Sequence, residues 1–392
     1  MSAAIPPLPD DPLAEELDRF VDRWRLVDRA RELDRAPAFP KTEFAEMGAA
    51  GWLGLDRKTE DGARALPPAR AGTLLYRLAY RAGTVFAKLS LQPGFSSVLE
   101  EHGSPALVER FYRPLVKGRR LVGNHLTEPD AGSDLGRLAT VATRDGSEYR
   151  ISGVKSEAAF ATDADAAIVY ARTPGSQGLD GITAFLIPQD SSGIRSTVIE
   201  DLGERWMRRG TVRYENVRVP IDHRIGDEGE GIRYVLPELA RERAYLALIY
   251  LGVARASWEQ TVRHVGERVV FDRPLHEHEA VAFPLVQDWG ELESCRQFAE
   301  RALVRIGAGE RADLDTSLAK TMATTIALRT IDHAIQFHGG AGYSRALPHE
   351  QRYRDVRSGA IAHGATELLL RSAARAIWRP PRGRAGRFQA SK

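Results

Sequence analysis

Residues 125–134 read His-Leu-Thr-Glu-Pro-Asp-Ala-Gly-Ser-Asp. The pattern is typical of a strand end followed by a turn, because Pro129 fixes its own backbone angle and cannot continue a sheet. The small residues Ala131, Gly132 and Ser133 then allow backbone N–H groups to approach an anionic or carbonyl-rich ligand. A plain polar turn would explain four of these residues, but it explains eight in this order poorly. The stretch therefore indicates a ligand-binding loop.

Alternating apolar and polar residues surround this loop over about residues 121–225. A period of two predicts strands, and Gly, Asp, Ser and Pro turns separate them. The predicted strands are residues 148–154, 166–172, 182–187, 194–199 and 211–219. Several short strands joined by close turns favour a small antiparallel barrel or sandwich.

Helical periodicity flanks the strands on both sides, up to about Lys117 and again over residues 229–378. Residues 244–254 are apolar on every side and too few to span a bilayer, so they predict a helix buried inside the protein. The order of helices, strands and helices predicts an α+β fold. We expect three domains, which are an N-terminal helical domain (1–118), a middle β domain (119–226) and a C-terminal helical domain (227–392).

The overall charge gives no reason to expect a nucleic-acid partner or insertion into a membrane. Lys plus Arg (55) nearly cancels Asp plus Glu (53), so no general electrostatic attraction arises. Cys295 is the only cysteine, which excludes an intrachain disulfide and fits a cytoplasmic protein. The basic, Pro- and Gly-containing residues 379–392 are expected to form a solvated, disordered end. No metal site is expected.

Residues 125–134 resemble the Thr-Glu-Pro-x-Ala-Gly-Ser-Asp signature of acyl-CoA dehydrogenases. Further stretches agree with that family in the same order, although each alone is a weak signal. They are residues 202–220, 268–278, 336–343 and 354–357. The resemblance extends over roughly residues 39–370. It implies the family's fold, with an N-terminal helical domain, a middle β-barrel or sandwich and a C-terminal four-helix bundle.

The resemblance also implies FAD, bound in the cleft between the middle and C-terminal domains. In the family, the loop holds the flavin ring and pyrophosphate, and Leu126, Thr127, Gly132 and Ser133 match the residues that do so. Other family contacts reach the FAD diphosphate of a neighbouring subunit or meet its adenosine half. The matching residues are Arg268, Phe271, His278, Gln336, Gly339 and Gly340. A homodimer or homotetramer is therefore expected.

The family's reaction is the α,β-dehydrogenation of an acyl thioester, here on CoA or an acyl-carrier protein. It needs a base within about 3 Å of the α-proton, and donors to the thioester oxygen, each worth ~2.7–4 kcal/mol in comparable sites. The electrons would pass to a flavoprotein or to oxygen. The family's base is the glutamate of Tyr-Glu-Gly-Thr, but His363 stands at that position here. Its backbone N–H, the family's oxyanion donor, survives the change.

Three interpretations of the missing glutamate remain open. Glu242 is the base in the first, because some family members take it from an earlier helix, just before an arginine, and Arg243 follows here. Arg243 would then shape the pocket. His363 is itself the base or a proton shuttle in the second, which would favour a flavin monooxygenase on the same scaffold. In the third, the protein binds acyl groups or flavin without dehydrogenation.

Further departures from the family concern the flavin's surroundings. Glu157 falls where an aromatic residue usually covers the flavin, unless Phe160 substitutes through a local shift. Asp272 and Glu279 stand where Gly and Gln are usual, near the cofactor diphosphate. Two acids there would weaken FAD binding unless they face away.

Overall fold

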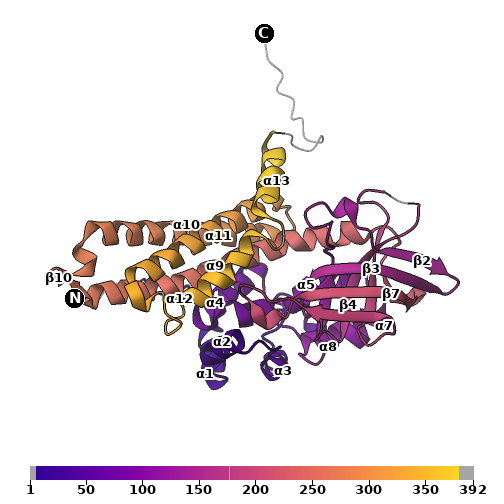
Figure 1. Ribbon diagram of the computed structural model, residues 1–392, viewed down its shortest axis with the longest axis horizontal. Coiled ribbons are helices and arrows are strands. Elements are labelled where there is room, and N and C mark those ends of the chain that lie inside the picture. The colour runs from indigo at the N-terminus through magenta and orange to yellow at the C-terminus, as the bar shows by residue number, and fades with distance from the viewer. Residues whose placement is uncertain (1–5, 176, 379–392) are drawn as a thin grey trace, which may run out of the picture.

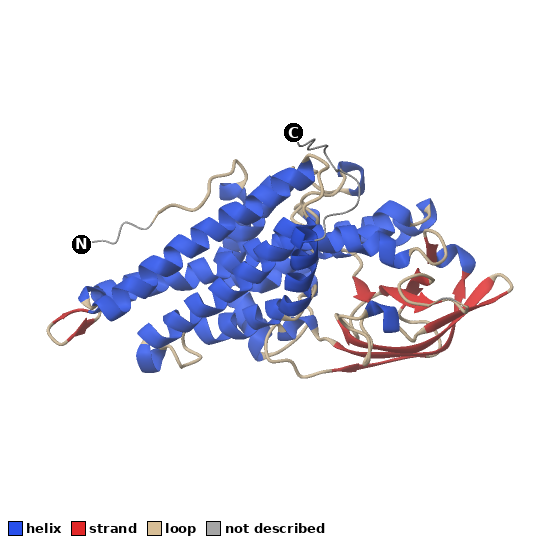
Figure 2. Cartoon of the chain, turned by 90° about the horizontal axis from the view of Figure 1, so that it is seen from above, coloured by secondary structure: helices blue, strands red, loops and turns tan. Residues whose placement is uncertain are grey.

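The computed structural model describes residues 6–175 and 177–378, so the predicted disordered end at 379–392 lies outside the described residues. A long helical body and a β-sheet lie at opposite ends of the molecule, and the first helices pack beneath the junction (Figure 1). In the perpendicular view the strands again gather at one end of the molecule, beside the end of the helical body (Figure 2). No helix among the described residues is long and apolar enough to cross a membrane.

The N-terminal segment is helical, as predicted. Its helices are α1 (Ala14–Arg23), α2 (Leu26–Arg35), α3 (Lys41–Ala49), α4 (Pro68–Ser90), α5 (Gln92–Phe95), α6 (Ser97–His102), α7 (Pro105–Leu107) and α8 (Arg113–Val116). The periodic apolar residues of α1, such as Leu17 and Val21, are buried. Acids occupy its first turn and Arg23 its last, which is the arrangement that a helix dipole favours.

The middle segment forms one mixed sheet. Its strands are β1 (Val122–His125), β2 (Val141–Asp145), β3 (Glu148–Ala158), β4 (Ala166–Arg172), β5 (Ile182–Pro188), β6 (Ile194–Val198), β7 (Gly210–Pro220) and β8 (Arg224–Ile225). Their order is β6-β7-β3-β2-β4-β5-β8, with β1 added beside β4. All five predicted strands are present. The pairings of β1 and β2 with β4 are parallel, so the sheet is not wholly antiparallel.

The C-terminal segment returns to helices, which are α9 (Gly231–Glu267), α10 (Glu279–Gly307), α11 (Asp313–Phe337), α12 (His349–Arg357) and α13 (Thr366–Trp378). A hairpin of β9 (Val269–Val270) and β10 (Arg273–Pro274) joins α9 to α10. Helix α9 packs against α10, α11 and also α4. The helical core is therefore shared between the N-terminal and C-terminal segments.

Helix α9 is the central element of the fold and carries the candidate base. It runs for 37 residues, roughly 55 Å at the rise of an α-helix. Residues 244–254 on it are all buried, as their uniformly apolar composition predicts. Glu242 lies directly before this buried stretch. Burial of the following turns fixes the direction in which its side chain projects.

Candidate active site

The two candidate bases lie beside each other. Glu242 projects from α9, and His363 lies in the loop between Ala360 and α13. The Nε2 atom of His363 is 3.6 Å from a carboxyl oxygen of Glu242. The Glu242 carboxyl accepts no hydrogen bond from any residue that the structure describes, and its side chain is only 6% exposed. The pair is thus a poorly solvated carboxyl beside an imidazole, each able to hold a proton.

The surroundings favour the neutral form of both groups. Burial, followed by the nearby Glu238 carboxylate, raises the pKa of Glu242 well above its usual value. Burial, followed by the positive charges of Lys88, Lys320 and Arg243, lowers the pKa of His363 to about 3. A carboxyl with a raised pKa is a stronger base once ionised, which suits removal of a weakly acidic α-proton. An uncharged imidazole with so low a pKa is a poor base by comparison.

The loop that carries His363 is held by two cations. The Nε atom of Arg243 donates a hydrogen bond to the His363 carbonyl oxygen at 3.0 Å. The Nζ atom of Lys320, on α11, donates to the carbonyls of Ala362 at 2.6 Å and Gly364 at 2.7 Å. Arg243, expected to shape the pocket, therefore acts on the backbone of this loop.

Two aromatic residues connect this pair to the sheet. The ring of Phe95, on α5, lies 5.0 Å from that of His363, and the Asn124 amide of β1 donates to the Phe95 carbonyl. The hydroxyl of Tyr170, on β4, is buried without a hydrogen-bond partner in the described chain. Burial and the nearby Glu242 carboxyl raise the pKa of Tyr170. Strand β1 pairs with β4 up to His125 opposite Val169, so Leu126 begins the predicted flavin loop beside Tyr170.

A buried ion pair anchors that loop. Lys155, on β3, is fully buried, and its Nζ atom lies 2.7 Å from Glu128 Oε1. It also donates to the Leu126 carbonyl at 3.1 Å. The Glu128 carboxylate accepts the backbone N–H groups of Ala139 and Thr140. Glu128 thus ties the loop to the chain that follows it.

The exposed part of the loop is free to meet a ligand. Gly132 and Ser133 are exposed, and their backbone N–H groups donate no hydrogen bond to the described residues. Only one atom, in the side chain of Thr127, lies within 4 Å of the position of a Cβ at Gly132. Donors left unbonded beside open space fit a carbonyl-rich or anionic group.

The remaining predicted cofactor contacts gather at the other end of the molecule. Arg268 and Phe271 lie at the end of α9, where Phe271 is 87% exposed. The ring of His278 bonds to the β9–β10 hairpin, since its Nε2 donates to the Val270 carbonyl and its Nδ1 accepts from Arg273. The ring of His338 stacks on that of His264 near the end of α9. This contact places the neighbouring residues Gln336, Gly339 and Gly340 at the same end.

One chain does not bring these two groups together. Arg268 is roughly 39 Å from Glu242 along the axis of α9, and Figure 1 places the β10 hairpin and the sheet at opposite ends. A single dinucleotide therefore cannot contact both groups within one chain. The cross-subunit FAD contacts that the resemblance implies stay a prediction.

The residues that differ from the family's usual ones near the predicted flavin lie in different surroundings. Glu157 is exposed and pairs with Arg209. Phe160 is buried against Phe39 and Trp206, so it packs in the core and does not take over the flavin-covering position. Asp272 is exposed and has a left-handed backbone, with φ of 61°. Glycine adopts this conformation without strain, which explains the family's usual residue there.

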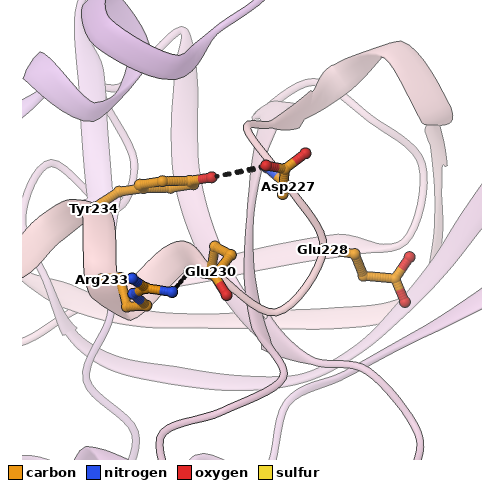
Figure 3. A pocket seen from close by; sticks show the side chains of 5 residues that line it. All are labelled: Asp227, Glu228, Glu230, Arg233 and Tyr234. Carbon is orange, nitrogen blue, oxygen red and sulfur yellow. Dashed lines mark hydrogen bonds and ion pairs between the residues drawn. The ribbon is translucent and has the colours of Figure 1, made fainter.

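A separate cavity of about 540 Å³ lies at the start of α9. Asp227, Glu228, Glu230, Arg233 and Tyr234 line it (Figure 3). Tyr234 contacts Asp227, and Arg233 pairs with Glu230. Glu230 precedes Glu242 on α9 by roughly 18 Å, and the acidic lining would repel phosphate groups. This cavity is therefore distinct from the Glu242–His363 pair.

Two residues of the site gave no signal in the sequence. Lys320 stands in a helix of ordinary composition, and Tyr170 belongs to a strand of apolar residues. Periodicity places each on an element, but it does not give the distance to a loop that lies far away in sequence. The contact of Lys320 with residues 362 and 364 arises only when α11 packs against that loop.

Comparison with known proteins identifies the family. Three family models match consecutive parts of the chain. They are the acyl-CoA dehydrogenase N-terminal domain at residues 11–119, the middle domain at 123–217 and the C-terminal domain at 229–378. The chain belongs to the acyl-CoA dehydrogenase family and has its three-domain fold.

Individual relatives agree with this assignment. A 3-(aryl)acrylate reductase of Clostridium sporogenes is 30% identical over 91% of this chain and 95% of its own. A short-chain specific acyl-CoA dehydrogenase of Clostridium acetobutylicum is 30% identical over 86% of this chain and 90% of its own. The solved butyryl-CoA dehydrogenase of Megasphaera elsdenii has a TM-score of 0.88 at 26% identity, covering 95% of this chain and 100% of that one.

Proposed function

We propose that the protein is an FAD-dependent oxidoreductase that removes two hydrogens from adjacent carbons of an acyl thioester, carried on CoA or an acyl-carrier protein. The observation that carries this proposal is the Glu242–His363 pair, because it places a carboxyl of raised pKa at the family's catalytic loop. The family assignment supports the reaction class. The named relatives are dehydrogenases and a reductase, so the monooxygenase alternative is not favoured.

Four residues of this chain would have separate roles in the proposed reaction, in addition to His363. Glu242 takes the proton from the α-carbon, and the backbone N–H of His363 donates to the thioester oxygen as negative charge develops there. Arg243 holds the His363 carbonyl, and so fixes the His363–Gly364 peptide that follows the donor N–H. The half-buried ring of Phe95 and the buried side chain of Tyr170 would limit the access of water to the carboxyl.

FAD is proposed as the cofactor, and bound FAD supplies a hydride acceptor for the β-carbon. Leu126, Thr127, Gly132 and Ser133 would hold the flavin end, because the loop leaves exposed, unbonded N–H groups there. Arg268, Phe271, His278, Gln336, Gly339 and Gly340 would hold the diphosphate and adenosine end in a neighbouring subunit.

An absorbance spectrum of the purified protein, followed by anaerobic titration with acyl thioesters, tests the function. The panel should include butyryl-CoA, a cyclic acyl-CoA and an aryl-propionyl-CoA, each also as the carrier-protein thioester. We expect a yellow protein whose flavin absorbance bleaches with at least one thioester. Failure to take up flavin, or flavin that no thioester bleaches, would reject the proposal.

We also propose that a redox flavoprotein is the electron acceptor. Mixing the bleached enzyme with such a flavoprotein and following reoxidation of the bound flavin tests this.

Replacing His363 with alanine separates the dehydrogenase from the monooxygenase. We expect the variant to retain bleaching by thioester, at a rate lowered about tenfold because the loop loses a packed ring beside Glu242. We also expect no oxygen-dependent product from wild-type protein supplied with external reduced flavin. An oxygenated product that disappears in His363→Ala would instead favour the monooxygenase.

We further propose that the protein acts as a homodimer or homotetramer. Phe283 and Val286 on α10 and Met322 on α11 are exposed apolar residues, and a groove between the two helices includes Gly290 and Ile326 in its lining. An exposed apolar surface of this kind is typical of a contact between subunits. The distant flavin contacts described above also require a second subunit.

The variant Val286→Glu tests the oligomer. A charge buried between subunits should weaken association by several kcal/mol, so we expect a smaller mass in analytical ultracentrifugation and weaker retention of flavin. Val27→Glu, on α2 and also exposed, is the matched control and should leave both unchanged. Equal masses for wild type and Val286→Glu would exclude this face as the interface.

A further inference from the structure

Three successive carbonyl groups around His363 are all bound by cations. Lys320 holds those of Ala362 and Gly364, and Arg243 holds that of His363 between them. The two cations come from α11 and α9, respectively. Such a set is unusual for a loop, because the carbonyls of a surface turn are normally left to water.

The backbone at the centre of this loop has an uncommon conformation. His363 and Gly364 both have left-handed backbones, with φ of 53° and 100°. A non-glycine residue in this region is strained by roughly 1–2 kcal/mol, so the hydrogen bonds from Lys320 and Arg243 must offset the strain. The backbone N–H groups of His363 and Gly364 donate no hydrogen bond to the described residues. Both N–H groups therefore lack an acceptor within the described chain.

A cation on one end of a peptide group strengthens the donor at the other end. The Ala362 carbonyl and the His363 N–H belong to the same peptide group, whose C–N bond has partial double-bond character. An ammonium at the oxygen draws electron density from the nitrogen and makes its N–H a better donor, as in any polarised chain of hydrogen bonds. The distance of 2.6 Å between Lys320 Nζ and that oxygen is short enough for a strong charge-assisted bond.

We propose that Lys320 is a positioning residue that orients and polarises the Ala362–His363 peptide, so that the His363 N–H binds the thioester oxygen more strongly as charge develops. The inference rests on the proposed function, because it concerns the oxyanion contact of that reaction. Lys320 need not touch the substrate, since it acts through the peptide that does.

The charge state of Lys320 makes this effect depend on pH. Within the described chain, the charged or titratable groups that act on Lys320 and on the residues of its loop include Arg243 and Glu242 on α9, Asp313 on α11, Lys88 on α4 with its partner Glu204, and His363. Burial, followed by Arg243 and Lys88, lowers the pKa of Lys320 to about 7. The ammonium is therefore present below about pH 7 and is lost as the pH rises through that value. A neutral amine can still hold the carbonyls, but it polarises the peptide less.

The test compares Lys320→Met and Lys320→Arg with the control Thr321→Val. Thr321 lies on the same helix, and within the described chain its hydroxyl donates to the Ser317 carbonyl alone. This control therefore removes a buried polar group without affecting the loop. Each FAD-loaded protein is mixed anaerobically with butyryl-CoA, or with whichever thioester bleaches wild type fastest. The limiting rate of bleaching and the half-saturating concentration are measured across pH.

We expect Lys320→Met to lower the limiting rate about tenfold, with little change in the half-saturating concentration. This loss of rate is smaller than the ~100-fold loss seen when an oxyanion donor is removed outright. Lys320→Arg should recover most of the rate. Because arginine keeps its proton, the fall in rate above about pH 7 in the wild type should be absent in Lys320→Arg.

Two outcomes would overturn the inference while leaving the function intact. One is wild-type rates in Lys320→Met, and the other is an unchanged pH profile in Lys320→Arg. The second comparison remains decisive if Lys320→Met fails to fold. If no thioester bleaches the wild type, the proposed function fails first and this inference falls with it.

Discussion

Glu242→Gln is expected to abolish the bleaching of bound flavin by an acyl thioester under anaerobic conditions. Glutamine keeps the size and hydrogen-bonding capacity of the side chain but cannot accept the α-proton. Positioned bases contribute roughly 10²–10⁴-fold to such rates, so the loss should be at least about 100-fold. Because His363 is 3.6 Å away, the same experiment also decides which of the two neighbours is the base. Unchanged bleaching in Glu242→Gln would assign that role elsewhere.

The pH dependence provides a second check on Glu242. Its pKa is raised, so the base form accumulates as the pH rises, and the rate of bleaching should increase through the pKa of Glu242. Glu238 lies one helical turn earlier, is buried, and contributes to that raised pKa. Glu238→Gln is therefore the matched control. It should retain bleaching, and its rising limb should move to lower pH because the repelling charge is gone.

Lys155→Met should destabilise the protein by about 3–5 kcal/mol, because it leaves the buried Glu128 carboxylate without its partner. Burial raises the pKa of Glu128, but the Lys155 ammonium and the hydrogen bonds from Thr140 and Ala139 together outweigh burial, so the pKa lies below its usual value. Glu128 is therefore ionised at neutral pH and would become an uncompensated buried charge. Urea unfolding measures the loss of stability.

The same variant should weaken flavin binding. Lys155 and Glu128 fix the loop that exposes Gly132 and Ser133, and a loop without this anchor would have to be ordered when flavin binds. Fluorescence titration of the apoprotein with FAD measures the change. The double variant Lys155→Met/Glu128→Gln removes both charges and should recover part of the stability. A Lys155→Met protein as stable as wild type would show that the pair does not anchor the loop.

Much of the fold followed from local patterns. The strands at residues 166–172 and 182–187 were predicted within one residue of β4 and β5. Short runs of β-branched and aromatic residues between turns are typical of strands. The strands β1 and β2, of four and five residues, were not predicted individually. Their parallel pairing with β4 also lay beyond prediction, because periodicity does not say which strands become neighbours.

The candidate site was only partly predictable. The sequence singled out Glu242 and His363 separately, from a resemblance and from the chemistry of their side chains. It offered them as competing bases, whereas the structure makes them neighbours. Neither Lys320 nor Tyr170 was predicted, because a lysine in a helix and a tyrosine in a strand usually have structural roles.

The amino-acid sequence alone determined the three segments, the buried central helix and the loop of small residues after a strand. These features depend on periodicity and on the backbone preferences of a few neighbouring residues. Tertiary packing alone decided the distance of Glu242 from His363, the raised and lowered pKa values of the pair, and the separation of Arg268 from the flavin loop. Those properties depend on burial and on charges brought together from distant parts of the chain. Local sequence patterns therefore do not predict them.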